Sequence, residues 1–328
     1  ATDLVPTGYE VAKEQFRMGT SDFFARQSLL SGKLDYHEKE GMLCFSSGRI
    51  SGRFDLKKGK LCEYAIDGKC PIKSGQYPEP LFWRAPTDGD FGNKMPLTMG
   101  MWRNAHINPM VRSVTVGEKQ VGGLPIKVVF TLGGLGVPYT VEYLIQNDGS
   151  IRVTPLMEMD GKTLPELPRF GMRMVLQPAY DNLFYYGRGP LENYVDRYTS
   201  CFVGRYESKV KDQFYPYIRP QETGNKTDVR WLMLLDGKGT GLQVTGLQPI
   251  AFSALHSSVE DLDPGLTKKM LRSIDVFPRR EVYLNVDLRQ RGLGGDNTWG
   301  QFPYRQYRML GGKYTYSFVM KLVDANER

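Results

Sequence analysis

The stretch at residues 292–300, GLGGDNTWG, has the residue types of a sugar-binding loop. Glycines on both sides allow unusual backbone angles, and Asp296, Asn297 and Trp299 stand between them. An indole face can stack on the apolar face of a pyranose ring, and a neighbouring amide and carboxylate can bind hydroxyl groups. A tryptophan buried in the core is an equally good interpretation of the residues alone. The stretch is therefore a candidate substrate-binding loop with one structural alternative.

A second group of polar side chains stands at residues 185–197, YYGRGPLENYVDR, which we expect to form a loop between two strands. The polar residues of this stretch are Arg188, Glu192, Asn193, Asp196 and Arg197. Charged groups that are buried are normally paired, so the residues favour a network of the two arginines with the two carboxylates over direct contact with a ligand. Such a network would hold a long loop against a sheet.

Two further stretches carry charges at turns. In FWRAPTDGDF, residues 82–91, Arg84 precedes Asp88 and Asp90; the two carboxylates suggest a calcium loop, but the other ligands of an EF-hand are missing. Pairing of Arg84 with a carboxylate is the favoured interpretation. In residues 215–231, Glu222 and Asn225 could bind sugar hydroxyls, although a long ordered loop needs the same groups internally.

Several function classes have no support in the residues. Lysine plus arginine (43) exceeds aspartate plus glutamate (36) by seven, but the excess is scattered and forms no basic stripe for nucleic acid. No apolar run is long enough for a membrane span. The three histidines lack metal-binding spacing, and neither a nucleophile elbow nor a phosphate loop occurs. We assign no metal, cofactor, nucleic acid or membrane.

Alternation of apolar and polar residues with period two predicts an all-β fold. It is clear in IRVTPLMEM, VYLNVDL and YTYSFVMKL. More than about a dozen such runs without helical crossovers predict two large antiparallel sheets packed face to face. Short helices are expected only in residues 95–104 and 258–273, the latter with Asp263 as N-cap before Pro264.

Four motifs in order carry a resemblance to a known family. They are RAPTDGD at 84–90, YYGRGPLENYVDR at 185–197, PQETGN at 220–225 and GGDNTWG at 294–300. In this order they resemble the C-terminal, small-chain domain of β-galactosidases of glycoside hydrolase family 2. The resemblance covers about residues 24–323. It implies a β-supersandwich of the galactose-mutarotase-like type for residues 21–328. Residues 1–20, which include a strand expected at 8–18, resemble the end of a preceding immunoglobulin-like domain and its linker.

The resemblance also implies a role. Retaining hydrolysis in that family uses two glutamates, with carboxyl groups about 5 to 5.5 Å apart, on a barrel that has no counterpart here. The chain would then be inactive alone, would pack on the catalytic barrel and would bring Trp299 to the galactoside, with homo-oligomerisation as a further expectation. The preferred galactoside and the compartment stay open.

Two other functions are kept as alternatives. Mutarotases share the implied fold and need a histidine acid with a carboxylate base, for which His256 or His106 with Glu222 could be combined. An autonomous carbohydrate-binding module is the other alternative. Fold analogy alone does not choose between these functions.

Overall fold

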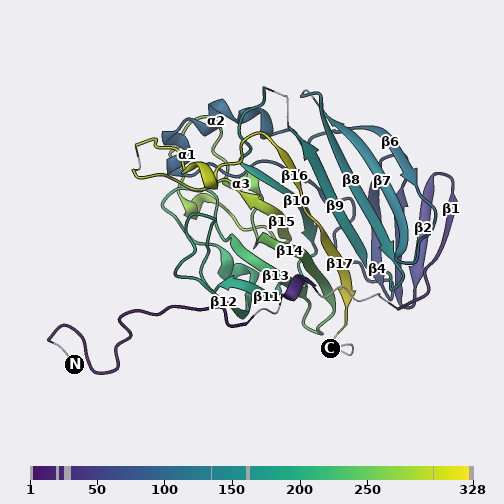
Figure 1. Cartoon of the computed structure of the whole chain (residues 1–328), viewed down its shortest axis with the longest axis horizontal. Helices are drawn as coiled ribbons and strands as arrows, with labels where there is room; N and C mark the ends of the chain where they lie inside the picture. The colour runs from purple at the N-terminus through teal and green to yellow at the C-terminus, as the bar shows by residue number, and fades with distance from the viewer. Residues whose placement is uncertain are drawn as a thin grey trace.

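The computed structural model describes residues 3–19, 22–25, 31–133, 135–159, 163–297 and 299–324, and the strands form two antiparallel sheets (Figure 1). The smaller sheet contains β1 (Asp35–Lys39), β2 (Met42–Ser47), β3 (Ile50–Asp55) and β4 (Lys60–Ile66) in sequence order. Tight turns containing Gly41, Gly48 and Gly59, all at positive φ, join these strands. These four strands form an antiparallel meander.

The larger sheet has 13 strands, and its main path runs β12-β11-β13-β14-β17-β9-β8-β7-β6. Its members are β5 (Glu79–Leu81), β6 (Met110–Val116), β7 (Gly123–Leu132), β8 (Val137–Gln146), β9 (Ile151–Glu158), β10 (Arg169–Leu176), β11 (Asn182–Gly189), β12 (Phe202–Lys209), β13 (Lys226–Leu235), β14 (Gly241–Leu255), β15 (Val282–Gln290), β16 (Lys313–Thr315) and β17 (Phe318–Val323). The predicted all-β antiparallel fold is confirmed, although the two sheets are unequal, with 13 strands and four strands, rather than both large.

Strand β14 is long enough to have two sets of neighbours on one side. Its first half, from Gly241 to Gly246, pairs with β17, whereas Ala251 to Leu255 pair with β15. On its other side β13 pairs with both halves. The branch β15-β10-β5 therefore leaves the main path of the sheet at β14.

Alternating burial joins the two sheets in one hydrophobic core. Along β8 and β9 the side chains alternate between buried and more exposed positions, as period-two patterning requires. The ring of Phe54 on β3 meets that of Tyr143 on β8 edge to face, with centroids 5.0 Å apart. The hydroxyl group of Tyr64 on β4 donates to the carbonyl of Gly149 at 2.9 Å. The small sheet therefore packs against the part of the large sheet that contains β7 to β9.

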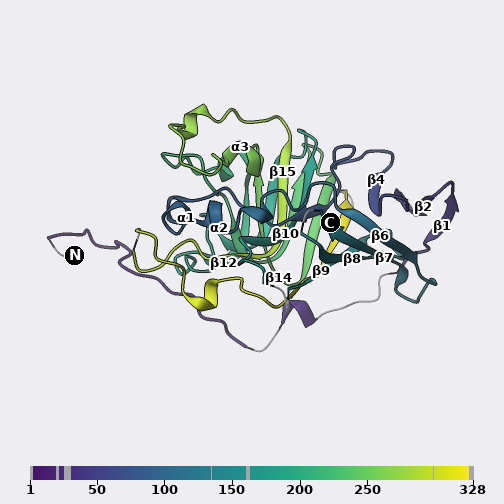
Figure 2. The same ribbon diagram turned by 90° about the horizontal axis from the view of Figure 1, so that it is seen from above.

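The helices are short, and α1, α2 and α3 lie at the end of the molecule away from the small sheet (Figures 1 and 2). They are α1 (Asp88–Gly92), α2 (Met95–Thr98), α3 (Val259–Leu262) and the 3-10 turns η1 (Phe23–Ala25), η2 (Gly100–Trp102), η3 (Val210–Gln213), η4 (Ser273–Asp275) and η5 (Arg305–Tyr307). No helix in the described ranges is long and apolar enough to span a membrane. The helical turns expected at 95–104 are confirmed, and α1 is an additional helix.

Three local predictions are wrong. Ser258, not Asp263, caps α3, and Asp263 instead accepts hydrogen bonds from the Trp83 indole and the Arg103 guanidinium, so no helix starts there. The stretch at 185–197 is not all loop, because its first residues complete β11. The strand expected at 8–18 does not form, because the backbone of this segment pairs with no described strand.

The leading segment nevertheless touches the edge of the large sheet. The side-chain amide of Gln15 donates to the Val203 carbonyl at 2.8 Å and accepts from the Val203 N–H at 2.7 Å. Val203 lies on the edge strand β12. The boundary expected between residues 20 and 21 lies outside the described residues.

Candidate functional site

Four loops that are distant in sequence border one open cleft of about 570 Å³. They contribute residues 87–89, 194–197, 217–222 and 293–297. Each loop belongs to one of the stretches that the sequence singled out. The fold therefore brings the four polar stretches to one place, which their separation along the chain did not require.

Buried ion pairs hold the loop at 87–89. Arg84, which is fully buried, grips Asp90 with two hydrogen bonds of 3.1 Å and 2.8 Å. Asp90 also accepts from the Thr87 N–H at 3.0 Å, which completes a capping box at the start of α1. Arg84 further donates to the Gly292 carbonyl at 2.9 Å. One side chain thus links the 87–89 loop to the start of the 292–300 loop.

A second arginine, next to Arg84, extends this network. Arg291 pairs with Asp90 at 2.9 Å and with Glu166 at 2.9 Å, and all three side chains are buried. Burial and the neighbouring Arg84 guanidinium lower the pKa of Arg291, while the two carboxylates oppose this effect. No local motif marks Arg291 or Glu166, so the sequence alone does not point to them.

Glu222 and Asn225 belong to another buried network. Glu222 accepts from Arg169 at 2.7 Å and from the Gln290 amide at 2.8 Å, and the same amide donates to Asn225 at 3.2 Å. Arg169 also lies 3.3 Å from Asp287. Complete burial raises the pKa of Asp287 to about 7, and the negative charge of Glu222 acts in the same direction, against the attraction of Arg169.

Paired backbone and side-chain bonds connect the 190–197 loop to the 222–227 segment. The Asn193 N–H donates to the Asn225 carbonyl at 2.8 Å, and the Asn225 amide donates to the Asn193 carbonyl at 2.7 Å. The Asn193 amide donates back to the Arg188 carbonyl at 3.1 Å. These bonds hold both loops against β11 and β13.

The charged residues of the 185–197 stretch do not form one network. Arg197 pairs with Glu192, and Glu192 also accepts from the Gly224 N–H at 2.8 Å. Arg188, on β11, instead lies 3.4 Å from Asp228 and donates to the Cys201 carbonyl at 2.9 Å. Asp196 accepts from the backbone N–H groups of Leu293 at 2.6 Å and Gly294 at 3.2 Å. The expected four-residue cluster is therefore split among three places.

The 292–300 loop presents its tryptophan to solvent. The side chain of Trp299 is 89% exposed, so the alternative of a core tryptophan is wrong. The Asn297 side chain accepts from the Trp299 N–H at 2.9 Å, and Asp296 accepts from the Tyr304 hydroxyl group. Asp296 and Asn297 line the cleft, whereas Trp299 stands beyond its lining.

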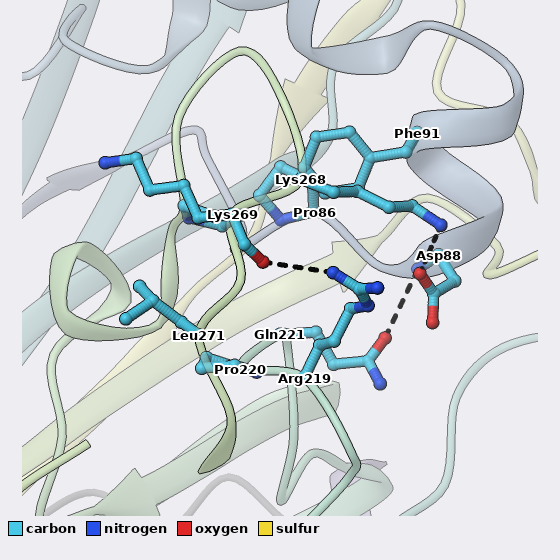
Figure 3. Close-up of a pocket in the computed structure, with 10 residues that line it drawn as sticks. Pro86, Asp88, Phe91, Arg219, Pro220, Gln221, Lys268, Lys269 and Leu271 are labelled. Atoms are coloured by element: carbon cyan, nitrogen blue, oxygen red, sulfur yellow. Dashed lines mark hydrogen bonds and ion pairs between the residues drawn. The ribbon is translucent and has the colours of Figure 1, made fainter. Parts of the chain in front are cut away.

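Asp88 lies at the border between the cleft and a smaller adjoining pocket (Figure 3). Its carboxylate pairs with Lys268 at 2.5 Å, and its N–H donates to Gln221 at 3.4 Å. Arg219 donates to the Lys269 carbonyl at 3.0 Å across the same pocket. Asp88 thus faces Lys268 rather than Arg84. No group of three or more potential metal ligands occurs among the described residues.

The histidines proposed for mutarotase chemistry do not meet Glu222. His106 lies 3.2 Å from Arg173 and 4.0 Å from Glu260, and burial with the Arg173 charge lowers its pKa. His256 lies 3.0 Å from the Glu281 carbonyl. Because Glu222 is bound by Arg169 and Gln290, the required acid and base are not assembled from these residues.

Comparison with known proteins identifies the family. The profile described as beta galactosidase small chain matches residues 46–320. This chain belongs to the β-galactosidase small chain family. It is 34% identical over 321 residues to a beta-galactosidase of Priestia megaterium, and the match covers 98% of this chain and 30% of that protein. It is 31% identical over 308 residues to a beta-galactosidase of Halalkalibacterium halodurans, covering 92% of this chain and 29% of that one.

The small chain therefore spans about a third of the length of these curated relatives. Among solved structures, a galactose 1-epimerase from Lactobacillus acidophilus is similar with a TM-score of 0.45 and 10% identity, covering 90% of this chain and 99% of that one. The four motifs by which the sequence resembled the family lie within or next to the matched residues of the small chain profile.

Proposed function

We propose that this small chain is the supporting part of a β-galactosidase, in which it completes the sugar site while carboxylates outside the chain perform retaining hydrolysis. Family membership and the share of the relatives' length that the chain spans support this division of labour. Two of the carboxylates at the cleft, Asp196 and Glu222, are bound by backbone N–H groups and by arginine respectively. Groups held in this way are suited to positioning loops.

The exposure of Trp299 is the observation that carries the proposal. A large aromatic side chain that is 89% exposed on a loop normally has a partner. Arg84 and Asp196 anchor the start of the loop that bears it, which lowers the entropic cost of ordering this loop on binding. Stacking on the apolar face of a galactosyl ring is the use that this arrangement supports, with Asp296 and Asn297 beside it.

An apolar ridge supports the proposed packing on the catalytic barrel. We define the ridge as the exposed apolar residues of two adjoining loops: Tyr215, Ile218, Leu266, Met270, Leu271, Ile274 and Phe277. The loops are joined by the bond from Arg219 to the Lys269 carbonyl and by one from Ser273 to the Tyr217 carbonyl. Residues 264–280 carry five basic residues and one acidic residue. An apolar surface with a carboxylate rim would complement this ridge.

The test uses the full-length enzyme that contains this chain. Trp299→Ala should raise KM for a galactoside by about 5- to 150-fold, the equivalent of about 1 to 3 kcal/mol for one aromatic contact. Trp299→Phe should give an intermediate value. Tyr36→Ala, at an exposed aromatic side chain on β1, is the matched control and should leave KM unchanged.

An unchanged KM in Trp299→Ala would remove this residue from the sugar site. The 328-residue chain alone should not hydrolyse a chromogenic galactoside, and robust hydrolysis by it would contradict the division of labour.

A further inference from the structure

We propose that the cleft bordered by the four loops is a carbohydrate subsite of this chain itself, which binds hydroxyl groups of a neutral pyranose. The proposal rests on the proposed function only for the class of ligand. Sugar binding in this cleft differs from the proposed stacking of Trp299 on the substrate, because binding in the cleft requires no residue outside the chain. Two polar atoms at the cleft that have no hydrogen-bond partner among the described residues support the proposal.

The first of these atoms is the hydroxyl oxygen of Tyr194. The side chain is 1% exposed and lines the cleft, yet its Oη has no hydrogen-bond partner in the described structure. The Tyr194 ring is held in place by the Arg197 guanidinium, 5.2 Å from its centroid. Tyrosine hydroxyl groups that are buried normally find a partner, so a ligand oxygen within reach would satisfy this one.

The second atom is Oδ1 of Asp196. Its other oxygen, Oδ2, binds the backbone of the 292–300 loop, which leaves Oδ1 buried without a partner among the described residues. A carboxylate oxygen accepts only, whereas a tyrosine hydroxyl can donate or accept. Together they fit a ligand that offers several hydroxyl groups, each of which can play either role.

The surrounding charges select a neutral ligand. Asp88, Asp196, Glu222 and Asp296 outnumber Arg197 along the lining, so an anion would be repelled. The attraction of the cleft for a cation is reduced, because Asp88 pairs with Lys268 and Glu222 with Arg169. The amides of Gln221 and Asn297 add groups that can both donate and accept.

The dimensions agree with this class of ligand. A cleft of about 570 Å³ lies within the range of roughly 300 to 1,000 Å³ that small-ligand sites occupy. Loops anchored by buried ion pairs form its walls, so little ordering is needed on binding.

Titration of the 328-residue chain with galactose, glucose and lactose by calorimetry tests the proposal. We expect saturable binding of at least one sugar, weakened about 5- to 10-fold in Tyr194→Phe. Gln221→Ala, at a partly exposed lining residue, should also weaken it. The urea concentration at the unfolding midpoint of Tyr194→Phe should not fall, because removal of this hydroxyl group breaks no hydrogen bond among the described residues.

Tyr185→Phe is the matched control. Tyr185 on β11 is also buried with an unpartnered hydroxyl group among the described residues, but it does not line the cleft. Its substitution should leave sugar binding unchanged. Three results would overturn the proposal. The first is no binding at sugar concentrations up to about 100 mM, because a specific site binds far more tightly than that. The others are equal affinity of Tyr194→Phe and the parent chain, and a loss of stability in Tyr194→Phe. None of them bears on the KM of Trp299→Ala, which tests the proposed function separately.

Discussion

Asp196→Ala should release the loop that carries Trp299. Its Oδ2 accepts two backbone hydrogen bonds, from Leu293 at 2.6 Å and from Gly294 at 3.2 Å. A hydrogen bond to a charged group contributes about 1.5 to 3 kcal/mol. The second bond is long, and the substitution also removes the buried Oδ1, which has no partner among the described residues. We therefore expect the free energy of local opening of the loop to fall by about 2 kcal/mol, near the lower limit of this range.

Amide hydrogen exchange followed by NMR measures this loss directly. A loss of about 2 kcal/mol in the opening free energy corresponds to roughly 30-fold faster exchange at Leu293 and Gly294. Asp196→Asn keeps one oxygen acceptor without the charge and should give a smaller increase. Asp88→Ala is the control, because Asp88 lines the same cleft but bonds to Lys268 and Gln221. Unchanged protection of the two amides in Asp196→Ala would refute the anchoring argument.

The other predictions concern pH and docking. Burial raises the pKa of Asp287 from its ordinary value of 3.8 to about 7, so its contribution to stability is fully present below pH 3.8 and is lost as the pH rises through about 7. Asp287→Asn should remove this loss, so urea unfolding should show the variant gaining stability relative to the parent between pH 4 and 8; parallel pH curves would count against the argument. For the ridge, a photo-cross-linking residue at Ile274, which is 84% exposed, should link to the proposed catalytic barrel, whereas one at exposed Val121 should not. Links between two copies would instead indicate a homo-oligomeric contact.

The strands were predictable because their signal is local. Alternation in IRVTPLMEM and VYLNVDL directly reflects one buried face, and these runs became β9 and β15. The predicted ends of elements were wrong where tertiary contacts determine the local structure. Asp263 has the local features of a helix cap, but the Trp83 indole and the Arg103 guanidinium bind it instead. A prediction from neighbouring residues could not include partners about 160 to 180 positions away.

The candidate site was predictable in its parts but not in its assembly. The motifs marked Arg84, Glu222 and Trp299, yet the pairing of Arg84 with Asp90 and of Glu222 with Arg169 depends on which loops the sheets bring together. Arg169 begins β10, Asp287 lies within β15 and Arg291 follows β15 directly, and no local signal marks any of them. Ion pairs between residues of different strands are a property of the topology, so one sequence without its relatives does not reveal them.

The change of neighbours along β14 has a consequence for how the protein loses its structure. The single strand β14 pairs with β17 along its first half and with β15 along its second half. Strand β15 contains Asp287 and leads to the loop that carries Trp299. Melting either side would strip partners from the same fifteen-residue strand. Heat or denaturant should therefore abolish the anchoring of the indole in the same cooperative step that dissolves the distant β9 ladder.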